Sequence, residues 1–122
     1  MAVAYATVRE QFGRPIGANQ AIKHLCADAA TRSEAAWASV NYASISLAEA
    51  RADAGFRVAV AARVALDAAL SNGRTNIQVH GGRGYTLDGP AHGFLLRTRV
   101  LEQVSGGTSR ARRALLAHDP LA

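Results

Sequence analysis

The chain has 122 residues, the length of one ordinary domain. Its composition, with 49% hydrophobic and 19% charged residues, excludes a disordered polypeptide. Alanine supplies roughly a fifth of the residues and aromatic side chains only 6%, which favours helices over a β-sandwich or barrel. The net charge of +5 leaves a basic helical nucleic-acid-binding module open, but the arginines are dispersed apart from Arg110, Arg112 and Arg113, so this function ranks a distant third.

The first half of the chain predicts a short and a long helix. Residues 2 to about 12 are expected to be helical, without a capping residue before them, and two glycines with Pro15 break the pattern over 13–19. A long helix is predicted over 18–51, because apolar residues recur at steps of three and four and would bury one face. This stripe consists of Ile22, Cys26, Ala29, Ala36, Val40, Ala43 and Leu47.

A second long helix is predicted over residues 56–79, after a turn in which Asp53 is the expected N-cap and Gly55 a breaker. Gly73 inside this helix costs about 1 kcal/mol relative to alanine, so close packing is expected there. The expected inner face consists of Val58, Ala61, Ala62, Ala65, Ala69 and Ile77.

The last third predicts a loop and two shorter helices. Residues 80–90, HGGRGYTLDGP, form the principal loop, and a helix follows over 90–104. A final helix is expected over 108–117, with Thr108 or Ser109 as its N-cap. Helices joined by short loops predict an all-α, antiparallel four-helix bundle.

The sequence offers little for metal or membrane chemistry. Cys26 is the only cysteine, which excludes a disulfide within one chain, and the four histidines do not form an i, i+4 metal pair. The longest apolar runs are far short of a membrane span, and the first residues lack the pattern of a secretory signal. We therefore expect a cytoplasmic protein that binds no metal and does not enter a membrane.

The densest group of glycines lies in Gln78–Tyr85, QVHGGRGY. A helix end needs only one left-handed glycine, and Gly81 could supply it. Three close glycines also let the backbone approach a ligand, and consecutive N–H groups can bind an anion, with Arg83 as a phosphate partner and Tyr85 as a stacking face. Both interpretations stay open from this loop alone, because it does not match the pattern G-x-G-x-x-G.

Two stretches together resemble a known family. Residues 9–16 read Arg-x-Gln-Phe-Gly-x-Pro-Ile and residues 20–24 read Gln-Ala-Ile-Lys-His, while residues 78–86 read Gln-x-His-Gly-Gly-x-Gly-Tyr-Thr. In this order and at this separation they resemble the signatures of the acyl-CoA dehydrogenase family. The resemblance continues through Arg97, Leu101 and Gly107–Thr108 and covers essentially the whole chain.

The resemblance implies that residues 1–122 are the C-terminal all-α domain of such an enzyme, without its N-terminal helical and middle β domains. The family uses FAD to oxidise the Cα–Cβ bond of an acyl-CoA thioester and passes electrons to an electron-transfer flavoprotein. The domain mediates oligomerisation, so a homo-oligomer (dimer or tetramer) or a flavin-carrying partner subunit is expected. The stretch with His92 after the glycine loop resembles a subgroup of the family, and some members of that subgroup act on bulky acyl groups such as sterol side chains. The resemblance therefore implies either a fatty acyl or a sterol side-chain substrate.

The same resemblance assigns the cofactor residues. Six would contact the FAD of the neighbouring subunit, and a seventh would contact the subunit's own FAD. The six are Arg9, Gln11, Phe12, Gln78, Gly81 and Gly82, and the seventh is Thr108. The usual catalytic glutamate position holds Gly106, and Glu102, one turn earlier, is expected to face the surface. We therefore expect no catalytic residue in this chain, no activity from it alone, and weak or absent FAD binding.

One alternative within the family remains. The chain could be a stand-alone, non-catalytic helical subunit that completes the flavin site of a partner. It predicts a native polypeptide near the length of this chain, whereas a domain of a complete dehydrogenase predicts a much longer one.

Overall fold

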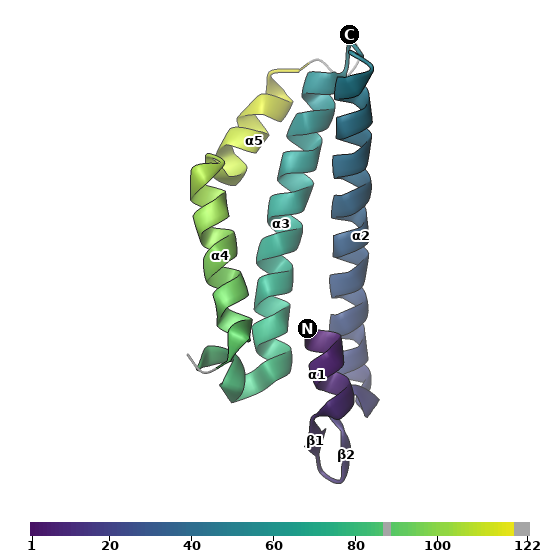
Figure 1. The fold of residues 1–122 in the computed structure, drawn as a ribbon, viewed down its shortest axis with the longest axis vertical. Helices are drawn as coiled ribbons and strands as arrows, with labels where there is room; N and C mark the ends of the chain where they lie inside the picture. The colour runs from purple at the N-terminus through teal and green to yellow at the C-terminus, as the bar shows by residue number, and fades with distance from the viewer. Residues whose placement is uncertain (87–88, 119–122) are drawn as a thin grey trace.

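The structure is a computed structural model that describes residues 1–86 and 89–118, and it is almost wholly helical (Figure 1). This confirms the all-α prediction. The elements in chain order are helix α1 (Ala2–Val8), strands β1 (Glu10–Gln11) and β2 (Arg14–Pro15), 3₁₀ helix η1 (Ile16–Ala18), α2 (Gln20–Ala48), α3 (Ala54–His80), 3₁₀ helix η2 (Gly81–Tyr85), α4 (Pro90–Val104) and α5 (Gly107–Leu116).

Helix α3 forms the centre of the molecule. Helix α2 runs antiparallel to it on one side, and α4 followed by α5 covers the other side, while α1 lies against the lower ends of α2 and α3 (Figure 1). Small residues let these helices approach closely. A Cβ on Gly73 would lie only 3.1 Å from Leu95 Cδ1 of α4, which confirms the expected close packing at this glycine.

A polar network fixes α2 against α3 near their middle. Arg32 Nε donates to Asn72 Oδ1 at 2.9 Å, and Arg32 Nη2 donates to Thr75 Oγ1 at 3.2 Å. Asn72 Nδ2 in turn donates to the carbonyl oxygen of Ala29 and to Ser33 Oγ, both at 2.9 Å. Because these bonds satisfy partly buried polar groups, they specify one relative position of the two helices.

The helix predicted to reach residue 12 ends at Val8, and a β-hairpin follows. Glu10 pairs with Pro15 and Gln11 with Arg14, so Phe12 and Gly13 form the two-residue turn. Both have positive φ, +53° and +77°, as a turn that matches the strand twist requires. The prediction was wrong here because it did not allow a phenylalanine in the left-handed region.

The long helices form where the sequence predicts them, but their apolar faces are only partly covered. Ala43 of the predicted α2 stripe is buried, whereas Leu47 is 58% exposed; in α3, Ala61 and Ile77 are buried but Val58 is exposed. Other exposed large apolar residues include Val3, Trp37, Ile45, Phe94, Leu96, Val100, Leu101, Val104 and Leu116. Apolar surface of this extent is typical of a domain that packs against further protein.

Two predicted helix starts differ in detail. Asp53 does occupy the N-cap position of α3 but makes no side-chain cap, since arginines bind its carboxylate, and Gly55 continues the helix instead of breaking it. Gly106 caps α5, so the expectation of Thr108 or Ser109 was wrong. Residues 87 and 88 of the predicted loop lie outside the described residues. Within residues 1–86 and 89–118, no helix has the length and apolar character to cross a bilayer.

Candidate functional site

The two signature stretches meet at one end of the molecule, where they line a shared cavity of about 440 Å³. Segments from α1, the hairpin, the last turn of α3 and η2 contribute to its walls. Five of the seven residues that the resemblance assigns to FAD are among the lining residues: Arg9, Gln11, Gln78, Gly81 and Gly82. Segments some 65 residues apart in the sequence therefore form one polar hollow.

An aromatic stack holds α1 against the end of α3 beside this cavity. The rings of Tyr5 and His80 lie 4.1 Å apart between centroids at an interplanar angle of 23°. His80 Nδ1 lies 2.7 Å from the carbonyl oxygen of Asn76, and because a carbonyl only accepts, Nδ1 carries the proton. The sequence placed His80 in a signature but did not reveal its stack with Tyr5, since the stack depends on how α1 meets α3.

The three glycines of η2 differ in whether the fold requires glycine at their position. Gly81 has φ +60° and ψ −140°, a backbone conformation that only glycine adopts readily. A Cβ on Gly84 would lie 2.5 Å from the carbonyl oxygen of Ile77, so any side chain there would clash with the backbone. Gly82 has neither constraint, since its φ is not positive and nothing lies within 4 Å of a Cβ placed on it. The fold of this chain does not require glycine at position 82.

Phe12 projects from the hairpin beside this cavity. It is 97% exposed and holds a left-handed backbone, which is unfavourable for a residue with a side chain. It is the one residue of the first signature's cofactor set that does not line the cavity. An exposed phenyl ring in a strained turn gives this chain no burial, so it is available to contact another molecule.

The cavity is rich in positive charge and hydrogen-bond donors. Arg9 and Arg83 line it, and neither guanidinium takes part in an ion pair or hydrogen bond within the part of the chain that the structure describes. Arg14 donates to Asn19 Oδ1 at 2.8 Å, which fixes the second strand against the lining residue Asn19. Unpaired guanidinium groups next to glycine backbone are suited to binding a phosphate group.

Thr108, the seventh predicted cofactor residue, lies elsewhere, in the first turn of α5, and does not line this cavity. The preceding glycines, Gly106 and Gly107, have φ values of +83° and +71°. Glu102 was expected to face the surface, but its side chain is only 14% exposed and accepts a hydrogen bond from Arg99 at 2.9 Å. The turn from α4 into α5 folds over it: a Cβ on Gly107 would lie 3.8 Å from Glu102 Cγ.

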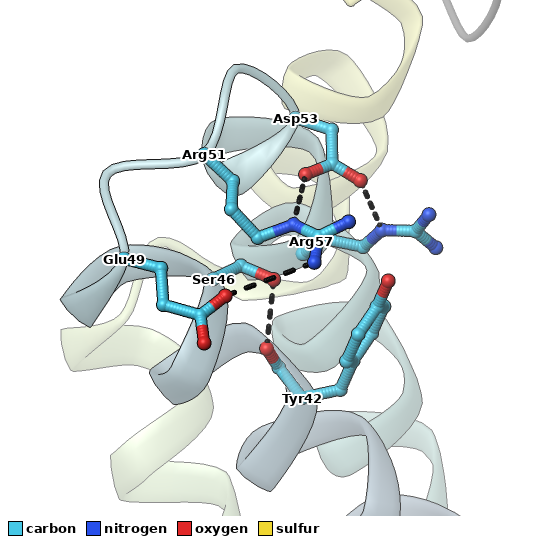
Figure 2. Close-up of polar contacts among 6 residues, drawn as sticks. All are labelled: Tyr42, Ser46, Glu49, Arg51, Asp53 and Arg57. Atoms are coloured by element: carbon cyan, nitrogen blue, oxygen red, sulfur yellow. Dashed lines mark hydrogen bonds and ion pairs between the residues drawn. The ribbon is translucent and has the colours of Figure 1, made fainter.

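The turn between α2 and α3, at the other end of these helices, is also rich in arginine, but its charges are paired (Figure 2). Asp53 accepts from Arg57 Nε at 2.8 Å and from Arg51 Nε at 3.4 Å. The hydrogen bond from Arg57 lowers the pKa of the Asp53 carboxyl below its usual value. Arg57 also lies 4.7 Å from the ring centroid of Tyr42, and buried Ser46 Oγ donates to the Tyr42 carbonyl oxygen.

A larger cavity of about 470 Å³ lies among α1, α2, α3 and α4, and most of its walls are apolar. Asn76 reaches it, and its buried Oδ1 has no hydrogen-bond partner within the described residues. No group of three or more His, Cys, Asp or Glu side chains that could hold a metal occurs in residues 1–86 and 89–118. Of these two cavities, the one at the hairpin combines glycine backbone with arginines that have no partner among the described residues.

Comparison with known proteins gives consistent results. Residues 1–119 match the family described as acyl-CoA dehydrogenase, C-terminal domain. The acyl-CoA dehydrogenase FadE34 of Mycobacterium tuberculosis is 44% identical over 121 residues, covering 95% of this chain and 16% of that protein. An acyl-CoA dehydrogenase of Bacillus subtilis is 40% identical over 116 residues, covering 95% of this chain and 30% of that protein.

Solved structures share the fold. A chain in the crystal structure of the ChsE4-ChsE5 complex from Mycobacterium tuberculosis has a TM-score of 0.87 at 33% identity, with 98% of this chain and 33% of that chain covered. A chain in a structure described as an electron transferring flavoprotein of Acidaminococcus fermentans has a TM-score of 0.88 at 33% identity, with 97% and 32% covered. The chain therefore spans about a third or less of the proteins it matches.

Proposed function

Because the chain belongs to the acyl-CoA dehydrogenase family, whose C-terminal domain it matches, we propose that it serves an FAD-dependent dehydrogenase by forming part of the oligomer interface and part of the FAD site. The observation that carries this proposal is the shared cavity, in which both signature stretches bring together Arg9, two glutamine amides and the backbone of Gly81 and Gly82. A ligand with phosphate groups would find donors there on several sides.

The residues present fit the nucleotide part of FAD. At Gly82 the chain leaves open a space that a side chain would occupy, although its own fold does not need glycine there. The guanidinium of Arg9 would bind a phosphate, and Gln11 and Gln78 would offer amide donors and acceptors to the nucleotide. When bound, FAD would supply a hydride acceptor for oxidation of the acyl-CoA Cα–Cβ bond.

The role of these residues is to bind and orient. They lie at an outward-facing end of the molecule, with Phe12 exposed beside them, so the cofactor would be held mainly by a neighbouring subunit. Thr108 lies away from the cavity and would contact the subunit's own FAD. Gly106 has no side chain, so the base that removes the α-proton would come from elsewhere in the assembly. The exposed apolar helix faces support an oligomer.

The wider setting follows from the family. The substrate would be an acyl-CoA, with a fatty acyl or sterol side-chain group, and electrons would pass to an electron-transfer flavoprotein in the cytoplasm. A stand-alone, non-catalytic subunit that completes a partner's flavin site is the second candidate. The similarity to a chain in a complex of two different proteins, ChsE4 and ChsE5, favours testing it. A nucleic-acid-binding module lacks comparable support.

The mass of the native polypeptide, detected with an antibody against this domain in the cells that produce it, separates the two candidates. A product much longer than 122 residues would support the domain of a complete dehydrogenase. A product of about this length would support the separate subunit, and its flavin-carrying partner could then be recovered by affinity purification.

The FAD site itself is tested by Gly82→Leu in the assembled enzyme, with absorbance of bound flavin as the measurement. We expect flavin content to fall while far-UV circular dichroism stays unchanged, because no atom of the chain lies within 4 Å of a Cβ placed at position 82. Unchanged flavin content would contradict the assignment of the cavity to FAD. So would stoichiometric FAD retained by the purified chain alone, because the chain would then hold a complete flavin site.

A further inference from the structure

We propose that Arg83 is a second diphosphate-binding residue, which acts together with Arg9 on the two phosphate groups of the dinucleotide. This inference rests on the proposed function, since it identifies a further residue of the same cavity. Arg9 follows α1 and Arg83 lies in η2, so the two guanidinium groups approach the cavity from separate segments of the chain.

The backbone of Arg83 is anchored while its side chain is free to bind. Its carbonyl oxygen accepts hydrogen bonds from the Thr86 backbone N–H at 3.4 Å and from Thr86 Oγ1 at 3.0 Å. The residue itself is exposed, and its guanidinium has no partner within the described residues. A fixed main chain with an unpaired cationic side chain reduces the ordering needed when a ligand binds.

Six other arginines have a partner within the described residues, so their side chains support this chain's own structure. They pair as Arg14 with Asn19, Arg32 with Asn72, Arg51 and Arg57 with Asp53, Arg63 with Asp67, and Arg99 with Glu102. Of the cavity-lining residues, Arg9 and Arg83 are the two that carry a permanent positive charge. The cavity therefore keeps two positive charges that no described carboxylate neutralises.

Two guanidinium groups are better matched to a diphosphate than to a monophosphate. Each planar guanidinium can donate two parallel hydrogen bonds to one phosphate, so a single phosphate leaves one arginine without an anionic partner. The Gly81 N–H already donates to the Gln78 carbonyl oxygen, but Gly82, which lines the same cavity next to Arg83, has no side chain to block a phosphate group. We therefore expect ADP to bind more tightly than AMP, and Arg83 to account for much of the difference.

The test is a titration of the ¹⁵N-labelled chain with ADP and with AMP, followed through the amide signals of Gly81, Gly82 and Gln78. The variants are Arg83→Ala, which removes the charge, and Arg83→Lys, which keeps the charge but not the bidentate geometry. Arg112→Ala on α5 is the control, because it lowers the net charge equally at an exposed position outside the cavity. Circular dichroism verifies that each variant folds.

We expect Arg83→Ala to weaken ADP binding about tenfold, and Arg83→Lys less, with little change for AMP or for Arg112→Ala. Equal ADP affinity of the wild type and Arg83→Ala, with signals still shifting at Gly81 and Gly82, would overturn the role of Arg83 and leave the proposed function standing. ADP shifts in the wild type that are centred outside this cavity, for example on the α2–α3 turn, would overturn the assignment of the cavity to a nucleotide.

Discussion

The two ends of α3 both carry arginines but use them differently. At its beginning, Arg51 and Arg57 share the carboxylate of Asp53, and Arg57 stacks on Tyr42 (Figure 2). At its end, Arg9 and Arg83 line a cavity without a carboxylate partner among the described residues. Charge paired inside the chain supports the fold, whereas unpaired charge beside an open cavity is available to a ligand. The number of arginines at a site does not distinguish these roles, but their partners do.

The strongest test of this contrast concerns two glycines of η2. Gly84→Ala is expected to destabilise the chain by about 3 kcal/mol, because the new Cβ would lie 2.5 Å from the Ile77 carbonyl oxygen and force the backbone to move. Gly82→Ala is the matched control and should change the free energy of unfolding by less than about 0.5 kcal/mol. Urea unfolding measures both, and equal effects would show that η2 is purely structural.

A second test removes the polar network between the two ends. Asn72→Ala is expected to cost about 2 kcal/mol, because it leaves Arg32 Nε without its partner and removes the bonds to Ala29 and Ser33. Asn41→Ala, at an exposed position of the same long helix pair, should cost much less. If Asn72→Ala weakened nucleotide binding while the protein stayed folded, the network would belong to the binding site.

At the turn between α2 and α3, where the arginines are paired, Asp53→Asn should lower the melting temperature slightly at neutral pH and low salt. The pKa of the Asp53 carboxyl is lowered in the folded state, so its contribution is present above the unfolded value of about 3.9 and is lost as the pH falls through the lower folded value. The difference from the wild type should therefore disappear below that pH and shrink in high salt. Asp28→Asn is the control, and a difference that persists in acid would contradict the ion-pair explanation.

No loss of stability is expected from a substitution at the tip of the hairpin. Phe12→Gly should leave the chain as stable or raise its stability by up to about 1 kcal/mol, because glycine tolerates a φ of +53° and the phenyl ring is 97% exposed. In the assembled enzyme the same change should reduce flavin retention. A clear loss of stability in the chain itself would show that Phe12 has a structural role that its exposure does not suggest.

The sequence predicted what depends on local pattern. The helices α2 to α4 follow from alanine content, apolar periodicity and breakers, and the close packing at Gly73 follows from its cost inside a helix. It could not predict that Phe12 adopts a left-handed conformation, or that Arg57 binds the Asp53 carboxylate instead of leaving it as a cap. Both outcomes depend on competing contacts between neighbouring residues.

Sequence patterns also did not predict how the residues of the site are arranged. The motifs name the residues, but only the fold shows that Arg9 and Gly82 line one cavity while Thr108 lies on another helix. The burial of Glu102 under the turn into α5 and the stack of Tyr5 on His80 likewise depend on tertiary packing. The distinct reasons for Gly81, Gly82 and Gly84 appear only from backbone angles and distances.

The most direct test of the central claim is an amide map of the ¹⁵N-labelled chain titrated with FAD. We expect any binding to the isolated chain to be weak, with the largest signal changes at Arg9, Gln11, Gln78, Gly81 and Gly82, and none at Arg51, Asp53 or Arg57. Changes centred on the α2–α3 turn, with the hairpin and η2 unchanged, would contradict the claim that this end of the domain is where the cofactor docks.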